Sequence, residues 1–141
     1  MSRIAYVNGN YLEFNKSLIH VEDRGYQFAD GVYEVINVLN GSLVDYDLHL
    51  ARLFRSLKEL NIKSPINKST YIYHIKNIIK KNIITDGLIY LQITRGVAPR
   101  DHKFPKISKS SIVITGRHLS SDDYESKFKN GIKVITAEDI R

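Results

Sequence analysis

The chain of 141 residues is long enough for one domain with a hydrophobic core, and its 43% hydrophobic and 26% charged residues are typical of a globular protein. It contains no cysteine, which excludes disulfides, thiolate metal sites and cysteine nucleophiles. The net charge of +6 is scattered rather than gathered on a basic face, and no apolar run approaches the roughly 20 residues that span a bilayer, so we expect a cytoplasmic protein without nucleic-acid or membrane partners.

Two hairpins are predicted in the first third of the chain. The β-prone runs Ile4–Val7 and Tyr11–Phe14 flank Asn8-Gly9-Asn10, and the runs Gly31–Leu39 and Ser42–Val44 flank a second Asn-Gly pair. Asn-Gly between such runs is the strongest short-range signal for a hairpin, because both residues tolerate a positive φ. The polar stretch 22–25 between the hairpins is expected to be a loop.

Two amphipathic helices are predicted next. The first has Asp45 as its N-cap and runs to about Asn61. The second ends with Lys80 and Lys81, where cations are favoured by the helix dipole. Apolar residues recur at helical spacing in both segments: Leu50, Leu53, Phe54, Leu57 and Leu60 in the first, and Ile72, Ile75, Ile78, Ile79 and Ile83 in the second.

The rest of the chain predicts strands at 88–94, 111–115 and 132–136 and a short helix at 121–129. Between the first two strands, residues 95–107 are too rich in glycine, proline and charge to continue a strand, which indicates a loop with a possible function. These elements predict an α+β fold in which an antiparallel sheet packs its apolar face on two helices.

Candidate chemical residues are few when the sequence is taken alone. No glycine-rich phosphate loop is present, the five histidines do not have metal-ligand spacings, and no Ser/His/Asp set can be specified. We therefore expect no metal. The residues that could carry chemistry are Arg24, Tyr26, Asp30, Tyr33, Glu34, Arg52, Arg95, Arg100 and His102.

A family resemblance is carried by the segment EDRGYQFADGVYEV at 22–35. This segment resembles the signature of the class IV transaminases, which depend on pyridoxal 5'-phosphate (PLP), and among them the D-amino-acid aminotransferases. The likeness continues through Asn40-Gly41, His49-Leu50-Ala51-Arg52, Gln92–Gly96, Arg100-Asp101-His102 and Glu138–Arg141. It implies the small N-terminal domain of the class IV fold at 1–120 and the truncated start of a second domain at 121–141.

The resemblance also implies roles for particular residues. Arg52 matches a contact to the PLP phosphate, for which a planar guanidinium is well suited, although by composition alone it would be a solvated helix arginine. Tyr33, Arg100 and His102 match the pocket that binds the substrate α-carboxylate in D-specific members, in which the loop comes from the partner subunit. Val35 matches a position that lines this pocket and Arg24 matches the signature loop, and a purely structural role is the alternative for both.

The expected reaction of the complete enzyme is D-alanine plus 2-oxoglutarate giving pyruvate plus D-glutamate. The family's lysine that forms a Schiff base with PLP follows the segment matching 134–141, so no catalytic residue is assigned here, and we expect the chain alone to be inactive and to bind PLP weakly or not at all. Partners would be a second copy in a dimer or a separate polypeptide carrying the C-terminal half. The alternatives are an inactive folded remnant, an interaction domain, or, within the family, a branched-chain aminotransferase or aminodeoxychorismate lyase.

Overall fold

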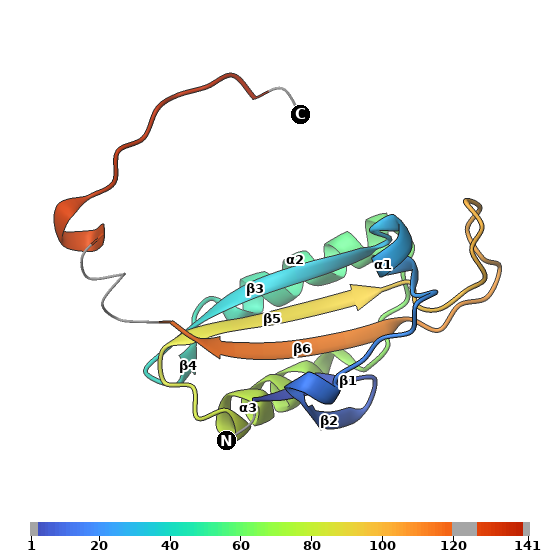
Figure 1. The fold of residues 1–141 in the computed structure, drawn as a ribbon, viewed down its shortest axis with the longest axis horizontal. Helices are drawn as coiled ribbons and strands as arrows, with labels where there is room; N and C mark the ends of the chain where they lie inside the picture. Colours follow the sequence, from blue (N-terminus) through green and yellow to red (C-terminus); the bar gives the residue numbers. More distant parts are fainter. Residues whose placement is uncertain (1–2, 120–126, 140–141) are drawn as a thin grey trace.

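The computed structural model describes residues 3–119 and 127–139. Its core is a six-stranded sheet in the order β2-β1-β6-β5-β3-β4, in which every neighbouring pair is antiparallel (Figure 1). The predicted α+β class is confirmed. The strands are β1 (Ile4–Val7), β2 (Asn10–Glu13), β3 (Gly31–Leu39), β4 (Ser42–Leu43), β5 (Gly87–Thr94) and β6 (Ser111–His118).

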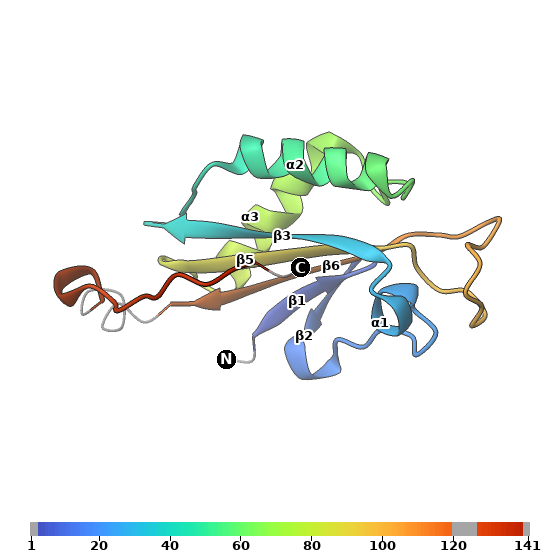
Figure 2. The same ribbon diagram turned by 90° about the horizontal axis from the view of Figure 1, so that it is seen from above.

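Helices cover one face of this sheet. Figure 2 shows α2 (Tyr46–Glu59) and α3 (Tyr71–Lys81) on the same side, where α2 packs on β3 and α3 packs on β1 and β6. The short helix α1 (Arg24–Phe28) lies at the end of the sheet where β3 begins. Two 3-10 turns, η1 (Phe14–Lys16) and η2 (Lys68–Thr70), complete the elements.

Both predicted hairpins are confirmed. Asn8 and Gly9 have φ values of 47° and 102°, and Asn40 and Gly41 have values of 50° and 73°, so each Asn-Gly pair occupies the left-handed region that a tight hairpin turn requires. The turns connect Val7 to Asn10 and Leu39 to Ser42, which are paired residues in the two ladders.

The predicted helix starting after Asp45 is also confirmed, but the predicted cap is wrong. Asp45 has a φ of 52°, and its side chain makes no capping hydrogen bond. A capping side chain reaches the first helical N–H groups from extended backbone, and the left-handed conformation of Asp45 removes that geometry.

Two further expectations need correction. Residues 24–28 form α1 rather than continuing the loop expected at 22–25, because Asp23 Oδ1 accepts a hydrogen bond from the Gly25 N–H at 2.8 Å and caps the helix. Residues 131–139 form no strand and are exposed, which contradicts the strand expected at 132–136. Of the helix expected at 121–129, residues 120–126 lie outside the described residues, and 127–130 form a helical turn.

The core lies between the sheet and the two long helices. Alternate residues of β3 are buried on the helix side. The largest fully buried side chain is Tyr71, and most of the others are aliphatic: Ile36, Val38, Leu53, Ile75, Ile78, Ile89, Leu91, Ile93, Ile112 and Ile114. Within the described ranges, no helix is long and apolar enough to cross a membrane.

Leu53→Ala should lower the free energy of unfolding by about 2–5 kcal/mol, because Leu53 is 1% exposed and truncation leaves a cavity. Leu48→Ala on the same helix is the matched control, because Leu48 is 70% exposed. Urea denaturation followed by circular dichroism measures both. Equal losses in the two variants would contradict the placement of the core under α2.

Candidate functional site

A buried carboxylate stands immediately before β3 and binds two arginines. Asp30 accepts hydrogen bonds from Arg24 Nε at 2.7 Å and from Arg95 Nε and Nη2 at 2.8 and 2.9 Å. Burial by itself would raise the pKa of the Asp30 carboxyl, but the hydrogen bonds and charges of Arg95 and Arg24 bring it below its ordinary value of 3.8. The group is therefore ionised at neutral pH.

The same arginines connect Asp30 to the rest of the fold. Arg95 also donates to the carbonyl oxygens of Leu60 and Asn61, at 2.9 and 3.1 Å, and so satisfies acceptors at the C-terminal end of α2. Arg24 reaches the loop that follows β5. One ion cluster thus joins α1, the start of β3, the end of α2 and the loop after β5.

A second buried carboxylate orients Arg52. Glu34 is 3% exposed and accepts hydrogen bonds from Arg52 Nε at 2.8 Å and from Arg52 Nη2 at 2.5 Å, while His49 Nδ1 lies 2.8 Å from Glu34 Oε2. Burial would raise the pKa of Glu34, but hydrogen bonds from Arg52 and His49 hold it below its ordinary value of 4.5. In turn, the hydrogen bond to Glu34 raises the pKa of Arg52 above its ordinary value.

Tyr33 and Val35 lie on the opposite face of the sheet from Glu34. The strand alternation that buries Glu34 leaves Tyr33 64% and Val35 38% exposed on the face opposite α2 and α3, called the open face below. Tyr33 stacks on Tyr90 of β5, with ring centroids 5.6 Å apart. Gln92, the ladder partner of Tyr33, accepts a hydrogen bond from the Tyr90 hydroxyl at 2.7 Å.

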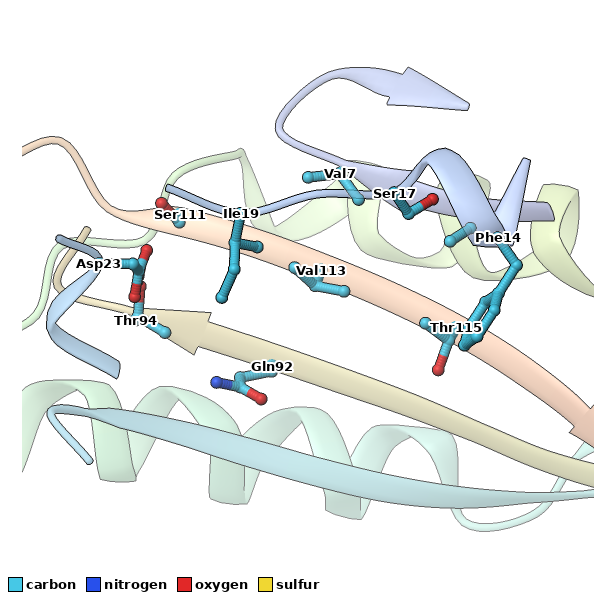
Figure 3. A pocket seen from close by; sticks show the side chains of 11 residues that line it. Val7, Phe14, Ser17, Ile19, Asp23, Gln92, Thr94, Ser111, Val113 and Thr115 are labelled. Carbon is cyan, nitrogen blue, oxygen red and sulfur yellow. Dashed lines mark hydrogen bonds between the residues drawn. The ribbon is translucent and has the colours of Figure 1, made fainter. Parts of the chain in front are cut away.

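A cavity of about 300 Å³ lies on this open face, beside Gln92 (Figure 3). Figure 3 shows the Asp23 and Thr94 side chains at one end and Phe14 and Thr115 at the other. Its lining residues are Ala5, Val7, Phe14, Ser17, Ile19, Asp23, Gln92, Thr94, Ser111, Val113 and Thr115. None of the predicted site residues lines this cavity. It lies next to the candidate site because Gln92, which lines it, pairs with Tyr33.

Arg100 and His102 are exposed on the loop after β5 and rest against α1. The Arg100 guanidinium carbon lies 5.3 Å from the centroid of the Phe28 ring, and the His102 ring lies 5.5 Å from it. Within the described residues, no hydrogen bond, ion pair or ring contact joins either side chain to Tyr33. The structure therefore groups the predicted site residues into three sets: Arg52 on α2, Tyr33 and Val35 on the open face, and Arg100 with His102 on the loop.

Arg52 has the donors that a phosphate group needs. Its Nε and Nη2 atoms are held by Glu34, whereas Nη1 makes no hydrogen bond within the described part of the chain, and the side chain is 55% exposed. A permanently charged guanidinium with one edge fixed and another edge open is suited to bind an anion. The residues present therefore fit the phosphate of PLP.

The sequence indicates Arg52 as a candidate for anion binding but not the side chains that orient it. Glu34 is a sequence candidate without an assigned role, and His49 is only part of a matched motif. The alternation of β3 could have indicated the role of Glu34, because it places this carboxylate among apolar residues on the helix side. A buried carboxylate requires cationic partners. Among the described residues, no group of three or more His, Cys, Asp or Glu is placed to hold a metal.

Sequence comparison gives the family of this chain. Residues 31–141 match the family described as Amino-transferase class IV. The chain is 38% identical over 134 residues to D-alanine aminotransferase of Bacillus licheniformis, and 38% identical over 136 residues to that of Listeria innocua. These matches cover 95% and 96% of this chain and 47% of each relative. The chain belongs to the class IV aminotransferases, and spans about half the length of these relatives.

Solved structures show the same fold. The branched-chain amino acid aminotransferase of Escherichia coli matches with a TM-score of 0.78 at 17% identity, over 84% of this chain and 42% of that one. The 4-amino-4-deoxychorismate lyase of Pseudomonas aeruginosa matches with a TM-score of 0.71 at 23% identity, over 91% and 44%. The chain thus corresponds to the N-terminal part of class IV aminotransferases, a family that uses PLP and whose members are typically homodimers acting on amino and keto acids.

Acid should destabilise the chain through Asp30 and Glu34. Because both folded pKa values are lowered, their stabilisation is fully present above the ordinary values of 3.8 and 4.5 and is lost as pH falls through the lower folded values. Asp30→Asn should cost about 3 kcal/mol at neutral pH, since it leaves Arg24 and Arg95 buried without a full partner.

The measurement is urea denaturation of the wild type and Asp30→Asn between about pH 7 and pH 3. The variant should lose less stability than the wild type over the acidic part of this range, because its residue 30 no longer titrates. Glu59→Gln, at an exposed carboxylate of α2, should leave the profile unchanged. Parallel acid profiles for the wild type and Asp30→Asn would contradict the assignment.

Proposed function

We propose that this chain forms the N-terminal domain of a PLP-dependent transaminase acting on D-amino acids, with D-alanine and 2-oxoglutarate giving pyruvate and D-glutamate. The observation that carries the proposal is the bidentate pair between buried Glu34 and Arg52, which leaves Nη1 open to an anion. The 38% identity to proteins named D-alanine aminotransferase supports the choice of substrate.

Each candidate residue has a distinct task in this proposal. Arg52 binds the PLP phosphate through the edge that Glu34 leaves open. Tyr33 and Val35 form part of the substrate pocket on the open face of the sheet, beside Tyr90. PLP, when bound, supplies the sink for the electron pair that remains when the α-proton leaves.

Arg100 and His102 supply the donors for the substrate α-carboxylate. A cation and a ring N–H together with the Tyr33 hydroxyl would fix one face of the amino acid and so set its stereochemistry. Because no described contact joins the loop to Tyr33 of the same chain, we propose that the loop serves the site of a second copy in a homodimer. We also propose a cytoplasmic location, and a boundary near residue 120, since β6 ends at His118.

PLP binding by the intact 141-residue chain should depend on Arg52. Because Arg52 is a single exposed contact, we expect a dissociation constant no tighter than about millimolar, which NMR titration can follow. Arg52→Ala should abolish this binding. Arg55→Ala is the matched control, because Arg55 is an exposed arginine on the same helix. Equal effects of the two substitutions would contradict the role of Arg52, and tight stoichiometric binding by the wild type would contradict the single-contact site.

The reaction is tested in a fusion, in which the complete chain is followed by the part of Bacillus licheniformis D-alanine aminotransferase that this chain does not match. We expect transamination between D-alanine and 2-oxoglutarate, and none with L-leucine. Preference for L-leucine would favour a branched-chain aminotransferase, and release of pyruvate from 4-amino-4-deoxychorismate would favour the lyase. A folded, PLP-loaded fusion without any of these activities would favour an inactive remnant.

A further inference from the structure

The loop between β5 and β6 is closed at its base by backbone contacts. Gly96 has a φ of 94°, and a Cβ atom placed on it would lie 1.9 Å from the carbonyl oxygen of Lys109. Only glycine allows this approach. The Arg24 N–H donates to the Gly96 carbonyl at 2.9 Å, and the Arg95 N–H donates to the Asp30 carbonyl at 3.0 Å. The two ends of the loop therefore meet next to the start of α1.

The outer part of the loop is held from one side by Arg24. Arg24 is 3% exposed, and its Nη1 donates to the carbonyl oxygens of Asp101 and Lys103 at 2.8 and 3.4 Å. Its Nε is fixed at the same time by Asp30 at 2.7 Å. One guanidinium thus connects a buried carboxylate to the two residues that flank His102.

Phe28, one turn along α1, supports the side chains themselves. Its ring has Arg24 at 4.7 Å, Arg100 at 5.3 Å and His102 at 5.5 Å. The first two are within the range of a cation–π interaction. Phe104 adds a second aromatic contact, with Arg95 at 4.6 Å and Arg24 at 5.7 Å. Arg100 and His102 are exposed, yet both have a fixed ring beneath them.

We propose that Arg24 and Phe28 are positioning residues that pre-form the Arg100–His102 loop for the substrate α-carboxylate. The inference rests on the proposed function of Arg100 and His102. It adds that the loop geometry is set within a single chain, before a second copy or substrate is bound. Holding donors in place in advance reduces the ordering cost of binding and favours the reacting geometry.

Two substitutions in α1 distinguish an effect on the loop from an effect on the stability of the whole fold. Arg24→Lys keeps a positive charge for Asp30, but a single ammonium cannot donate to Asp30 and both loop carbonyls in the fork geometry of a guanidinium. Phe28→Leu keeps an apolar side chain at this position but provides no π face. Tyr26→Leu is the matched control, because Tyr26 is a 73% exposed aromatic on the same short helix.

In the intact chain, limited trypsin digestion reports on the loop through cleavage after Lys103. We expect Arg24→Lys and Phe28→Leu to cleave at least about fivefold faster than the wild type, after any change in the rate of global unfolding is taken into account. Tyr26→Leu should cleave at the wild-type rate. Unchanged cleavage in both test variants would overturn the proposal. If Arg24→Lys unfolds, Phe28→Leu alone decides.

In the fusion, the same variants should raise KM for D-alanine about tenfold while kcat and PLP affinity change by less than about twofold. Equal losses in KM, kcat and PLP affinity would mean that α1 is merely structural, and would overturn the proposal. An inactive wild-type fusion would count against the proposed function, while the digestion result would still decide whether Arg24 and Phe28 hold the loop.

Discussion

The ionised carboxylate of Asp30 is the constraint on which much of this structure depends. Two arginines with 3% and 10% exposed side chains share it, and neither could be buried without an anionic partner, because desolvating an unpaired charge costs several kcal/mol. Each arginine then uses its remaining donors on backbone carbonyls: Arg95 at the end of α2 and Arg24 on the loop after β5. A single side chain therefore fixes the relative positions of four segments that are distant in sequence.

Glu34, four residues later, is also a buried carboxylate paired with an arginine, but this pair is open to solvent on one side. Its partner Arg52 is half exposed, so the buried carboxylate aims the guanidinium outward instead of closing a cluster. The intervening alternation of β3 places Tyr33 and Val35 on the other face of the sheet. The short segment from Asp30 to Val35 thus anchors the arginine that contacts the loop after β5, orients Arg52 and places two side chains on the open face.

Fold and specificity are separate in this family. The sheet and helices are shared with a branched-chain amino acid aminotransferase and a 4-amino-4-deoxychorismate lyase at 17% and 23% identity, so the architecture alone does not select a substrate. The residues proposed here to select the substrate are Tyr33 and Val35 on the open face and Arg100 and His102 on the loop after β5, and the fold leaves all four exposed.

The sequence by itself determined the elements whose signals are local. Both Asn-Gly hairpins follow from residues that accept a positive φ, the two long helices follow from apolar spacing, and the residues of the signature segment alone indicated the family. Two elements were missed or wrong because their formation depends on partners outside the segment. Helix α1 has an early glycine and depends on the Asp23 cap, and the apolar alternation at 132–136 has no strand to pair with among the described residues. Only the tertiary structure decided that Glu34 orients Arg52 and that Arg24 holds the 100–104 loop, because these partners lie 18 and about 77 residues apart and no sequence period brings them together.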